Sequence, residues 1–456
     1  MDLNGKRVLV VGLGRSGIAA AQLCAARGAR VTVTDKRDAG ALGEGLAGLP
    51  AGVARELGGH RRETFTAADL IVLSPGVPEI PELAAARAAG VTLTGEIELA
   101  SRFVSSTLIA ITGTNGKSTT TTLVGEMMRA TGRPTFVGGN LGEPLAEAVG
   151  TPAAEPGGVC IVEASSFQLE TVDTFHPRVA VLLNITADHL DRYPDMDGYA
   201  AAKARIFAAQ TGDDFAVVNA DDPLSMRVSE RIASRRFCFS VTRALPEGGH
   251  MDGNALVLRL PNQAPERFGA HLTWLTGQRH NQANTLAALL AARLAGATYE
   301  DAHIGLHAFQ PLAHRMELVA DSGGIAYYDD SKGTNVGAVV ASLDGFPRRI
   351  VLIAGGRDKG GDYAPMAVVL GRVGRAVVLI GEAADRMEAA LTGLLPVERA
   401  ATMEDAVEAA RRLAQPGDAV VLSPACSSFD MFRDYAHRAE VFRAAVARVV
   451  AREPAA

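Results

Sequence analysis

Short apolar runs alternate with helix-length segments along the chain. In the first hundred residues these runs predict strands at 6–11, 29–34 and 70–73, and apolar positions at helical spacing predict a helix over 16–27. Strands that alternate with helices run in the same direction, because each helix carries the chain back to the start of the next strand. The pattern therefore predicts an α/β domain built on a mainly parallel sheet.

The same alternation returns twice further along the chain. The second series predicts strands at 107–112, 159–163, 179–184 and 215–219, helices over 118–130 and 281–294, and β-hairpins or a long insertion over 244–271. The third series predicts strands at 325–328, 349–354, 376–380 and 419–422. Because 456 residues exceed what one hydrophobic core organises, we predict three domains over residues 1–98, 99–311 and 312–456.

Composition narrows the possible partners and the compartment. Hydrophobic residues make up 48% of the chain and charged residues 21%, which is typical of a globular protein. The formal net charge of -6 argues against nucleic acid as the main partner, since binding phosphate backbones needs a basic face. The sequence has no signal peptide and no apolar run of membrane-spanning length, and its four scattered cysteines indicate reduced thiols. These features predict a cytoplasmic protein without membrane insertion.

Lysine is rare in this chain. Of 45 basic residues only six are lysines: Lys6, Lys36, Lys117, Lys203, Lys332 and Lys359. Arginine serves wherever positive charge alone is wanted, so the lysines are candidates for chemistry that a guanidinium cannot perform.

A glycine-rich turn follows the first predicted strand. Residues 12–17 read Gly-Leu-Gly-Arg-Ser-Gly, and Asp35 ends the second strand. This spacing is typical of dinucleotide-binding turns, where helix amides face a phosphate and the acid binds a ribose hydroxyl. The turn at Ser74 and Gly76 follows another strand of the same sheet and is expected to touch the same ligand. The alternative is a tight strand–helix turn without a ligand.

A second glycine-rich loop is more informative. Residues 112–119 read Thr-Gly-Thr-Asn-Gly-Lys-Ser-Thr between an apolar strand and a helix. Loop amides would cradle phosphates, Lys117 would reach the β and γ oxygens, and Ser118 would ligate magnesium. The loop is a variant of the usual pattern, because Ile111 stands where a glycine is normal. The alternative, a Thr-rich helix cap, leaves the Gly-Lys-Ser sequence unexplained.

Polar residues follow two further strands of the second series. Glu163 ends one strand and is placed to hold magnesium, although an acid that starts a helix is the alternative. Asn184, Asp188 and His189 crowd into the loop after the next strand, which favours metal or substrate binding there. Lys203 follows on a helix predicted over 199–208.

Three polar loops end strands of the third series. They lie at 329–335, 354–360 and 423–430, and two of them contain scarce lysines, Lys332 and Lys359. Because the carboxyl ends of parallel strands meet at one edge, we expect the three loops to form a single binding rim.

Taken together, these motifs resemble the Mur ligase family over essentially the whole chain. The segments GTNGKST, ASSFQLE and DHLDRYP resemble motifs of the superfamily that also includes folylpolyglutamate synthase. The segments GLGRSG, DDSKGTN and LSPACSSFD resemble motifs of the members that add D-glutamate. The resemblance implies a Rossmann-like N-terminal domain, a central P-loop ATPase domain and a Rossmann-like C-terminal domain.

The resemblance also implies roles for individual residues, all by match to family motifs. The uridine diphosphate substrate would contact Gly14, Arg15, Ser16, Asp35, Lys36, Ser74, Gly76 and Asn140. ATP would contact Gly113, Thr114, Asn115, Gly116, Lys117, Ser118, Thr119, Asn284, His314, Arg315 and Asp330. D-Glutamate would lie among Lys332, Thr334, Lys359, Ser428 and Phe429. Two magnesium ions, replaceable by manganese, would be held by Ser118, Glu163, His189 and a carbamylated Lys203, and the catalytic group would be Lys117, His189, Lys203 and Arg315.

The implied activity is ATP-dependent amide formation in peptidoglycan precursor synthesis. D-Glutamate would be joined to UDP-N-acetylmuramoyl-L-alanine through an acyl phosphate, by an enzyme expected to be monomeric. One alternative keeps this chemistry with another amine, as in other Mur ligases or folylpolyglutamate synthase. Two others are a nicotinamide-dependent dehydrogenase, which leaves the second loop unexplained, and a nucleotide-binding regulatory module without turnover.

Overall fold

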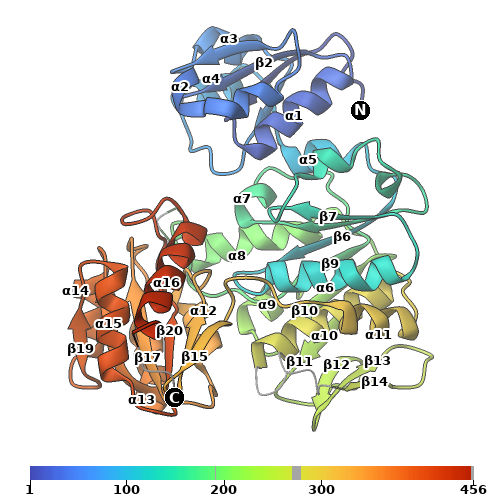
Figure 1. Ribbon diagram of the computed structural model, residues 1–456. Helices are drawn as coiled ribbons and strands as arrows, with labels where there is room; N and C mark the ends of the chain where they lie inside the picture. The colour runs from blue at the N-terminus through green and yellow to red at the C-terminus, as the bar shows by residue number, and fades with distance from the viewer. Residues whose placement is uncertain (191, 270–278, 453–456) are drawn as a thin grey trace. The chain divides into compact units, whose positions relative to one another are not determined.

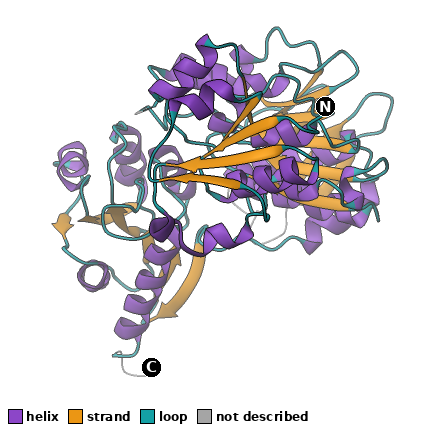
Figure 2. Cartoon of the chain, turned by 90° about the horizontal axis from the view of Figure 1, so that it is seen from above, coloured by secondary structure: helices purple, strands orange, loops and turns teal. Residues whose placement is uncertain are grey.

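The computed structural model describes residues 1–190, 192–269 and 279–452, and it folds into two compact units. The first unit consists of Met1–Asn184, Ala200–Phe268 and Asn284–Phe309. The second consists of the described residues of Ile185–Tyr199 and of those from Gln310 onward, together with residues 279–283. The described residues form three β-sheets with helices on the sheet faces (Figure 1; Figure 2).

The first sheet has five parallel strands in the order β3-β2-β1-β4-β5. Its strands are β1 Arg7–Val11, β2 Arg30–Asp35, β3 Ala54–Leu57, β4 Leu70–Leu73 and β5 Thr92–Gly95. Its helices are α1 Arg15–Ala26, α2 Ala39–Leu42, α3 Arg62–Ala67, α4 Pro81–Ala88 and α5 Glu96–Ser101, with the 3-10 turn η1 Gly43–Gly48. The chain order reverses between β1 and β4, so the loops after these two strands open at the point where doubly wound sheets bind ligands.

The second sheet has nine strands in the order β14-β13-β12-β11-β10-β9-β6-β8-β7. The strands are β6 Thr107–Thr112, β7 Thr135–Gly139, β8 Val159–Glu163, β9 Val179–Leu182, β10 Phe215–Asn219, β11 Arg235–Ser240, β12 Gly248–Asp252, β13 Ala255–Arg259 and β14 Glu266–Gly269. The helices and 3-10 turns are α6 Lys117–Ala130, η2 Leu145–Ala148, η3 Pro152–Ala154, α7 Ser166–Leu169, α8 Met196–Ala204, η4 Arg205–Phe207, α9 Pro223–Val228, α10 Arg279–Leu294 and α11 Tyr299–Ala308. The middle strand β6 is buried on both faces, which explains why it reads as a continuous apolar run.

Strand neighbours in this sheet bring three polar segments together. β6 pairs in parallel with β8 on one side and with β9 on the other. The carboxyl ends of these strands carry the glycine-rich loop, Glu163 and Asn184, respectively. On the face of the sheet beside them, α6 and α11 pack against each other (Figure 1).

The third sheet has six strands in the order β15-β16-β20-β17-β18-β19. The strands are β15 Glu317–Ser322, β16 Ile325–Asp329, β17 Ile350–Gly355, β18 Gly374–Ile380, β19 Val397–Arg399 and β20 Ala419–Leu422. The helices are α12 Val336–Leu343, α13 Ala364–Val373, α14 Ala384–Leu391, α15 Met403–Leu413 and α16 Tyr435–Val450. Alternate residues of β17 enter different apolar cores, Leu352 on one face and Ile353 on the other, so both faces must be covered.

The predicted fold class, three mainly parallel sheets in an α/β chain, is confirmed. The expected rim of the third sheet is also confirmed in its strand order, since β16, β20 and β17 are neighbours. The hairpin expected within 244–271 is present as β12 and β13, and residues 270 and 271 lie outside the described part. The domain limits at 98 and 311 stay predictions.

Several predicted boundaries were wrong by a few residues, and some strands were missed. The strand predicted over 179–184 ends at Leu182, because Leu183 and Asn184 turn to bind the glycine-rich loop. The helix predicted over 199–208 begins earlier, at Met196, and ends at Ala204. The edge strands β3 and β19 carry mixed polar residues, so their sequences lack the apolar signal of the central strands.

Two compositional expectations can be compared with the structure. All four cysteines are free thiols, as predicted. No described helix is long and apolar enough to cross a membrane.

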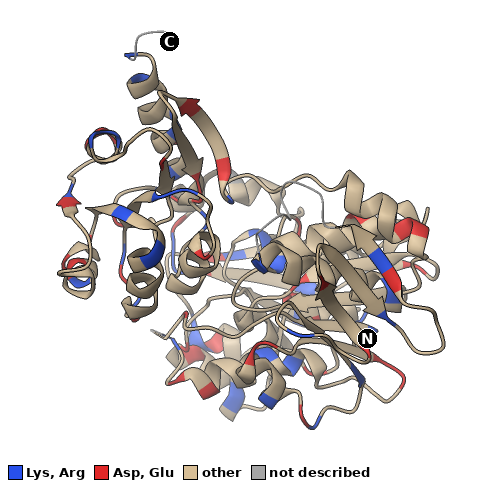
Figure 3. Ribbon diagram, turned by 90° about the horizontal axis from the view of Figure 1, so that it is seen from below, with Lys and Arg blue, Asp and Glu red and all other residues tan. Residues whose placement is uncertain are grey.

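Acidic and basic residues are interspersed along the ribbon of both units rather than gathered in one region (Figure 3).

Candidate active site

The loop between β6 and α6 has the backbone of a phosphate-binding turn. Gly113 and Gly116 adopt φ values of 157° and 86°, which side-chain-bearing residues rarely adopt. A Cβ on Gly116 would lie 2.2 Å from Oδ1 of Asn284, so this amide side chain packs directly on the loop. The N-cap residue of α6 is Gly116, which has no side chain to cap the first turn. The first backbone amides of this 14-residue helix lie at its N-terminus, where the helix dipole stabilises an anion.

Asn184, at the end of the neighbouring strand, fixes the shape of this loop. Its backbone carbonyl accepts a hydrogen bond from the amide of Thr114 at 2.9 Å. Its side chain accepts from the amide of Asn115 at 2.9 Å and donates to the Asn115 carbonyl at 3.0 Å. The loop conformation is thus held by the protein itself, as a preorganised binding site requires.

Two of the six lysines converge on this loop. Lys117 Nζ donates to the carbonyls of Gly113 at 2.9 Å and Thr114 at 2.8 Å. Lys203 Nζ, which is 1% exposed, donates to the same Gly113 carbonyl at 2.8 Å. Two lysine nitrogens that share one acceptor would repel each other if both were protonated, which favours either an anion nearby or a neutral amine at one of them. The structure therefore brings together residues that lie 86 positions apart in the sequence, 117 and 203.

Glu163 presents a bare carboxylate oxygen beside the loop. It ends β8, is 2% exposed, and its Oε1 accepts a hydrogen bond from Asn140 Nδ2 at 2.7 Å. No donor among the described residues reaches its Oε2. A buried carboxylate oxygen without a donor among the described residues suits a hard cation such as magnesium, and the hydroxyl of Ser118, 4% exposed at the start of α6, is of a type that could bind the same cation.

The first glycine-rich turn is organised differently. Asp35 accepts from the Leu13 amide at 2.8 Å and from the Arg37 guanidinium, whose Nη2 lies at 2.7 Å. Burial alone would raise the pKa of Asp35, but its hydrogen bonds to Arg37 and Leu13 lower it to about 2. Ser74 Oγ donates to the Gly12 carbonyl at 2.7 Å, which joins the loops after β1 and β4. The predicted contacts Gly14, Arg15, Lys36 and Gly76 are exposed around this turn, with Ser16 partly buried.

Two arginine contacts of this turn were not predicted from the sequence. Arg37 holds Asp35, and a basic residue two positions after a strand-ending acid was the available signal. Arg15 Nη1 donates to the Gly142 carbonyl of the second sheet's region at 3.3 Å.

The rim of the third sheet contains a buried acid. Asp330 is 4% exposed, its Oδ2 accepts from Ser423 Oγ at 2.6 Å, and burial raises its pKa to about 6. The next loop along the rim is tied to the same segment, because the Ala425 amide donates to the Gly333 carbonyl at 2.9 Å. The predicted residues Lys332 and Thr334 are partly buried in the loop that follows Asp330.

His314 lies at the start of this sheet in a left-handed conformation, with φ of 63°. Its Nδ1 lies 2.8 Å from Oδ2 of Asp329, and its ring is 6.0 Å from that of Tyr435. Tyr435 also lies under Lys332, whose Nζ is 5.0 Å from the ring centroid. Tyr435 was missed by the sequence analysis, because nothing in the α16 sequence marks its first residue as part of the rim.

Two further residues complete the rim. Ser428 is buried at 2% exposure, whereas Phe429 is 65% exposed. The fully buried Arg438 of α16 donates to the carbonyls of Ser331 at 2.8 Å and Cys426 at 3.2 Å, and so ties two rim loops together. Arg438 was also missed, since a buried arginine in an ordinary amphipathic helix gives no sequence signal.

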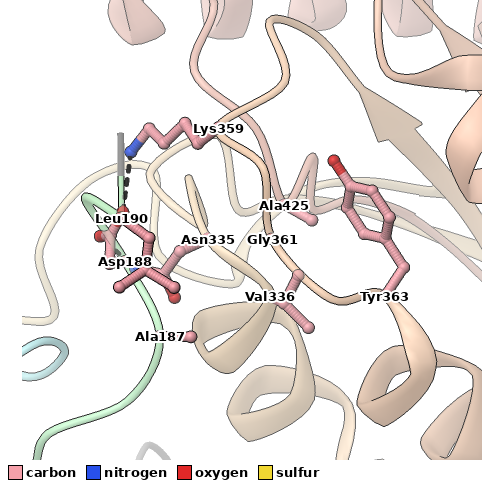
Figure 4. A pocket seen from close by; sticks show the side chains of 9 residues that line it. All are labelled: Ala187, Asp188, Leu190, Asn335, Val336, Lys359, Gly361, Tyr363 and Ala425. Atoms are coloured by element: carbon pink, nitrogen blue, oxygen red, sulfur yellow. Dashed lines mark hydrogen bonds and ion pairs between the residues drawn. The ribbon is translucent and has the colours of Figure 1, made fainter. Parts of the chain in front are cut away.

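A close ion pair joins the loop after β9 to the rim. Lys359 Nζ lies 3.1 Å from Oδ1 of Asp188, and Asn335 Nδ2 donates to Oδ2 of Asp188 at 3.0 Å (Figure 4). Burial raises the pKa of Asp188, but Lys359 and His189 outweigh it and the net pKa is lowered. His189 itself has a φ of 57°, and its Nε2 lies 3.7 Å from Asp188.

The residues predicted to bind the metal ions belong to both compact units, and so do those predicted to bind ATP. Of the predicted metal residues, Ser118, Glu163 and Lys203 belong to the first unit and His189 to the second. Of the residues predicted to contact ATP outside the glycine-rich loop, Asn284 belongs to the first unit, and His314, Arg315 and Asp330 to the second.

A separate cluster of ligand-type side chains contains His314, Glu317 and Asp329. Arg443 pairs with both Glu317 and Asp329, so the acidic charge of the cluster is already balanced by an arginine. This pairing makes the cluster a poor cation site compared with the bare oxygen of Glu163.

Most of the chain matches known protein families. Residues 6–95 match the N-terminal domain of MurD-like Mur ligases, residues 111–292 the Mur ligase middle domain, and residues 314–426 the Mur ligase glutamate ligase domain. A relative from Geotalea daltonii, named UDP-N-acetylmuramoylalanine--D-glutamate ligase, is 51% identical over 98% of both chains. A relative of the same name from Anaeromyxobacter dehalogenans is 50% identical over 97% of both chains.

Solved structures agree in fold. A pseudomurein peptide ligase type C from Methanothermus fervidus superposes with a TM-score of 0.63 at 18% identity, covering 98% of this chain and 100% of its own. A MurF ligase from Thermotoga maritima in complex with ADP superposes with a TM-score of 0.60 at 15% identity, covering 98% of this chain and 96% of its own. The family models and the relatives that are half identical along nearly the whole chain show that this chain belongs to the Mur ligase family.

Proposed function

We propose that this protein adds D-glutamate to UDP-N-acetylmuramoyl-L-alanine with the hydrolysis of ATP, in peptidoglycan precursor synthesis. The relatives that share half of its residues carry this activity in their names. The observation that carries the chemistry is the loop on which Lys117 and Lys203 meet beside the bare oxygen of Glu163. A cationic loop, a helix N-terminus and a buried acid together suit a magnesium–nucleotide complex.

ATP is the proposed nucleotide. The amides that open α6 and the Lys117 ammonium would face the β- and γ-phosphates, and Asn284 would lie on the adenine side. Arg315 would bind the γ-phosphate, His314 the adenine side and Asp330 the ribose. An ATP-using family is supported further by the related ligase that was solved in complex with ADP.

Two magnesium ions are proposed at Ser118, Glu163, His189 and Lys203, and manganese would substitute for magnesium. The bare Oε2 of Glu163 fits this role, and Asn140 holds the other carboxylate oxygen in place. The ions would supply charge neutralisation at the transferring phosphoryl group.

Lys203 is proposed to be carbamylated. A carbamate forms only on a neutral primary amine, and burial at 1% exposure favours the neutral form of an amine. The ammonium form first gives up one proton, and the neutral amine nitrogen then bonds to carbon dioxide and loses a second proton, so that a cation becomes an anionic oxygen ligand.

The reaction would proceed in two steps. The L-alanyl carboxylate attacks the γ-phosphorus of ATP, ADP leaves, and an acyl phosphate forms. The amine of D-glutamate then attacks the acyl carbon, and the tetrahedral intermediate expels phosphate as the amide forms. Lys117 and Arg315 would offset the charge that develops on the phosphoryl oxygens.

The remaining substrates are assigned to the first and third sheets. The uridine diphosphate group would bind the turn of Gly14, Arg15 and Ser16, with Asp35, Lys36, Ser74 and Gly76 around it, and Asn140 would lie near the substrate. D-Glutamate would bind the rim at Lys332, Thr334, Lys359, Ser428 and Phe429, where cationic and hydroxyl groups suit a dicarboxylate. The predicted domain ranges 1–98, 99–311 and 312–456 would correspond to these three tasks, in a monomer that works in the cytoplasm, where thiols stay reduced.

An amino-acid panel tests this function. ADP release would be measured with UDP-N-acetylmuramoyl-L-alanine, magnesium and ATP, and with D-glutamate, L-glutamate, L-alanine or a diamino acid in turn. Release only with D-glutamate is the expected result. Release with another amine would assign a different Mur-type or folylpolyglutamate-type ligation, and no release with any amine would contradict the ligase.

A further inference from the structure

The pair of Asp188 and Lys359 lines a small pocket of the second unit. The pocket lies between the loop after β9, the start of α12 and the loop after β17, and Leu190, Val336 and Tyr363 give it apolar walls (Figure 4). In Figure 4 the Lys359 side chain extends toward Asp188, and the dashed line marks their contact. The pocket lining thus combines one anion and one cation, in contact with each other, with apolar side chains.

The pocket is too small for an amino acid while the pair is closed. Its volume is about 20 Å³, which is room for one water molecule. A carboxylate that binds Lys359 in this pocket takes the place of Asp188 on the ammonium group. The ion pair is therefore in direct competition with any ligand that uses Lys359.

Separation of this pair is unfavourable unless both charges find new partners. The side chain of Asp188 is 8% exposed and that of Lys359 23% exposed, so water replaces their contact only in part. A buried charge that loses its partner is strongly destabilised. A dicarboxylate could pair with Lys359 but would leave Asp188 facing another anion. A zwitterion could satisfy both groups at once.

We propose that Asp188 and Lys359 form an exchangeable ion pair that selects an α-amino acid: Lys359 takes a carboxylate and Asp188 takes the ammonium group. The inference rests on the proposed function, in which Lys359 binds D-glutamate, and it adds Asp188 as a binding residue for the amino group. Asn335 keeps the Asp188 carboxylate in place during the exchange, since it donates to the oxygen that does not contact Lys359. The pair would thus recognise the amino group of the ligand, whose nitrogen becomes the amide nitrogen in the ligation.

Glutarate is the matched probe, because it is D-glutamate without the amino group. Dissociation constants of both ligands would be measured by calorimetry on the full chain, with magnesium, a non-hydrolysable ATP analogue and the uridine diphosphate substrate present. We expect the wild type to bind D-glutamate at least tenfold more tightly than glutarate. In Asp188→Asn we expect glutarate to bind about tenfold more tightly than in the wild type, and the preference for D-glutamate to fall to near unity. In the control Lys359→Met, both ligands should weaken together.

Two results would overturn the proposal. The first is equal binding of both ligands by the wild type, which needs no variant to fold. The second is an unchanged preference in Asp188→Asn; a raised magnesium requirement in that variant would then show that Asp188 acts through His189. If the wild type releases ADP with D-glutamate in either of these cases, only the ion-pair exchange fails. If it binds no D-glutamate, the proposed function fails as well.

Discussion

The two glycine-rich loops of the first unit share a backbone plan and differ in chemistry. Each follows a buried strand, places a glycine at positive φ and opens a helix of at least twelve residues, α1 or α6. At the first loop, the nearby carboxylate of Asp35 is already saturated by Leu13 and Arg37. At the second, two lysines meet on one carbonyl and Glu163 keeps an oxygen without a donor.

The difference teaches that the backbone pattern specifies only a place for an anion. Helix amides stabilise negative charge at either loop, whatever the ligand. Phosphoryl transfer also needs a cationic group near the phosphates and a group that can hold a metal. Of the two loops, it is the second that combines lysines with a nearby carboxylate oxygen that has no donor among the described residues. Matched substitutions at the two loops and at the other buried carboxylates test this division.

Lys117→Ala should abolish most of the activity. The lysine offsets charge that develops on the phosphoryl oxygens, a contribution of about 3 kcal/mol or more, so ADP formation should fall by about 100-fold or more. The matched variant at the first loop is Lys36→Ala, which should raise the KM for the uridine diphosphate substrate by less than about tenfold, since an exposed cation contributes little. Equal losses of ADP formation in the two variants would break the comparison.

Lys203→Arg should be nearly as damaging as Lys203→Ala. Arginine stays protonated and cannot form a carbamate, so it keeps the charge but loses the anionic ligand. Acetate should partly restore ADP formation in Lys203→Ala by supplying a carboxylate at the vacated position. Substantial activity in Lys203→Arg without such rescue would instead assign Lys203 to direct phosphate binding.

Asn140→Ala should raise the magnesium requirement by about 10- to 100-fold, because an oriented metal ligand loses its support. The measurement is the magnesium concentration for half-maximal ADP release. Glu163→Gln should raise this requirement at least as much, since the bare oxygen then loses its charge. If magnesium dependence is unaltered in both variants, Glu163 is a helix-start acid and not a ligand.

Ser428→Ala and Lys359→Ala should raise the KM for D-glutamate by about tenfold while the KM for ATP stays within about twofold. Both residues belong to loops on the rim of the third sheet. In the sequence, both are far from the loop that contains Lys117. Steady-state ADP release with each substrate varied in turn gives both constants. A parallel rise in the two constants would contradict the assignment of the rim to the amino acid.

The smallest effect concerns a second buried glutamate with a bare oxygen. Glu96 of α5 accepts a hydrogen bond from the Ala146 amide at 2.7 Å, and its Oε2 has no partner among the described residues. Burial raises the pKa of Glu96 to about 7. The raised pKa of Glu96 favours a proton, rather than a metal, on this carboxylate.

The free energy of unfolding depends on pH through Glu96. Between pH 4.5 and about 7 the folded state holds a proton that the unfolded state has lost, so the stability contributed by Glu96 falls as pH rises. Glu96→Gln should therefore raise the free energy of unfolding by about 1–3 kcal/mol above pH 7 and have little effect below pH 4.5. Denaturant melts at pH 5 and pH 8 measure this difference.

Glu98 is the matched control for Glu96. It is buried two residues along the same helix, but hydrogen bonds from Thr174, Asp173 and Arg102 outweigh burial and lower its pKa. Glu98→Gln should therefore destabilise the fold at neutral pH. A stability gain in both variants would show that burial, and not the missing donor, controls the two sites.

The central strands and the glycine-rich loops could be predicted from the sequence alone. Central strands such as β6, β8 and β20 are buried on both faces, so their apolar runs could be recognised without a structure. The glycines at 113 and 116 and the lysine at 117 also needed no tertiary information, because a local turn and its first helical residue lie next to each other in the sequence. The family resemblance rested on the same local segments.

Only the tertiary structure decided which side chains meet. Lys203 reaches the Gly113 carbonyl, Asn184 braces the loop, Arg438 ties the rim, and Asp188 pairs with Lys359 across 171 positions of sequence. Edge strands such as β3 and β19 were likewise fixed by pairing with a neighbour and not by their own residues. The physical reason is that hydrophobic patterning acts over a few residues, whereas hydrogen bonds and ion pairs depend on strand order, which brings distant segments to one edge of a sheet.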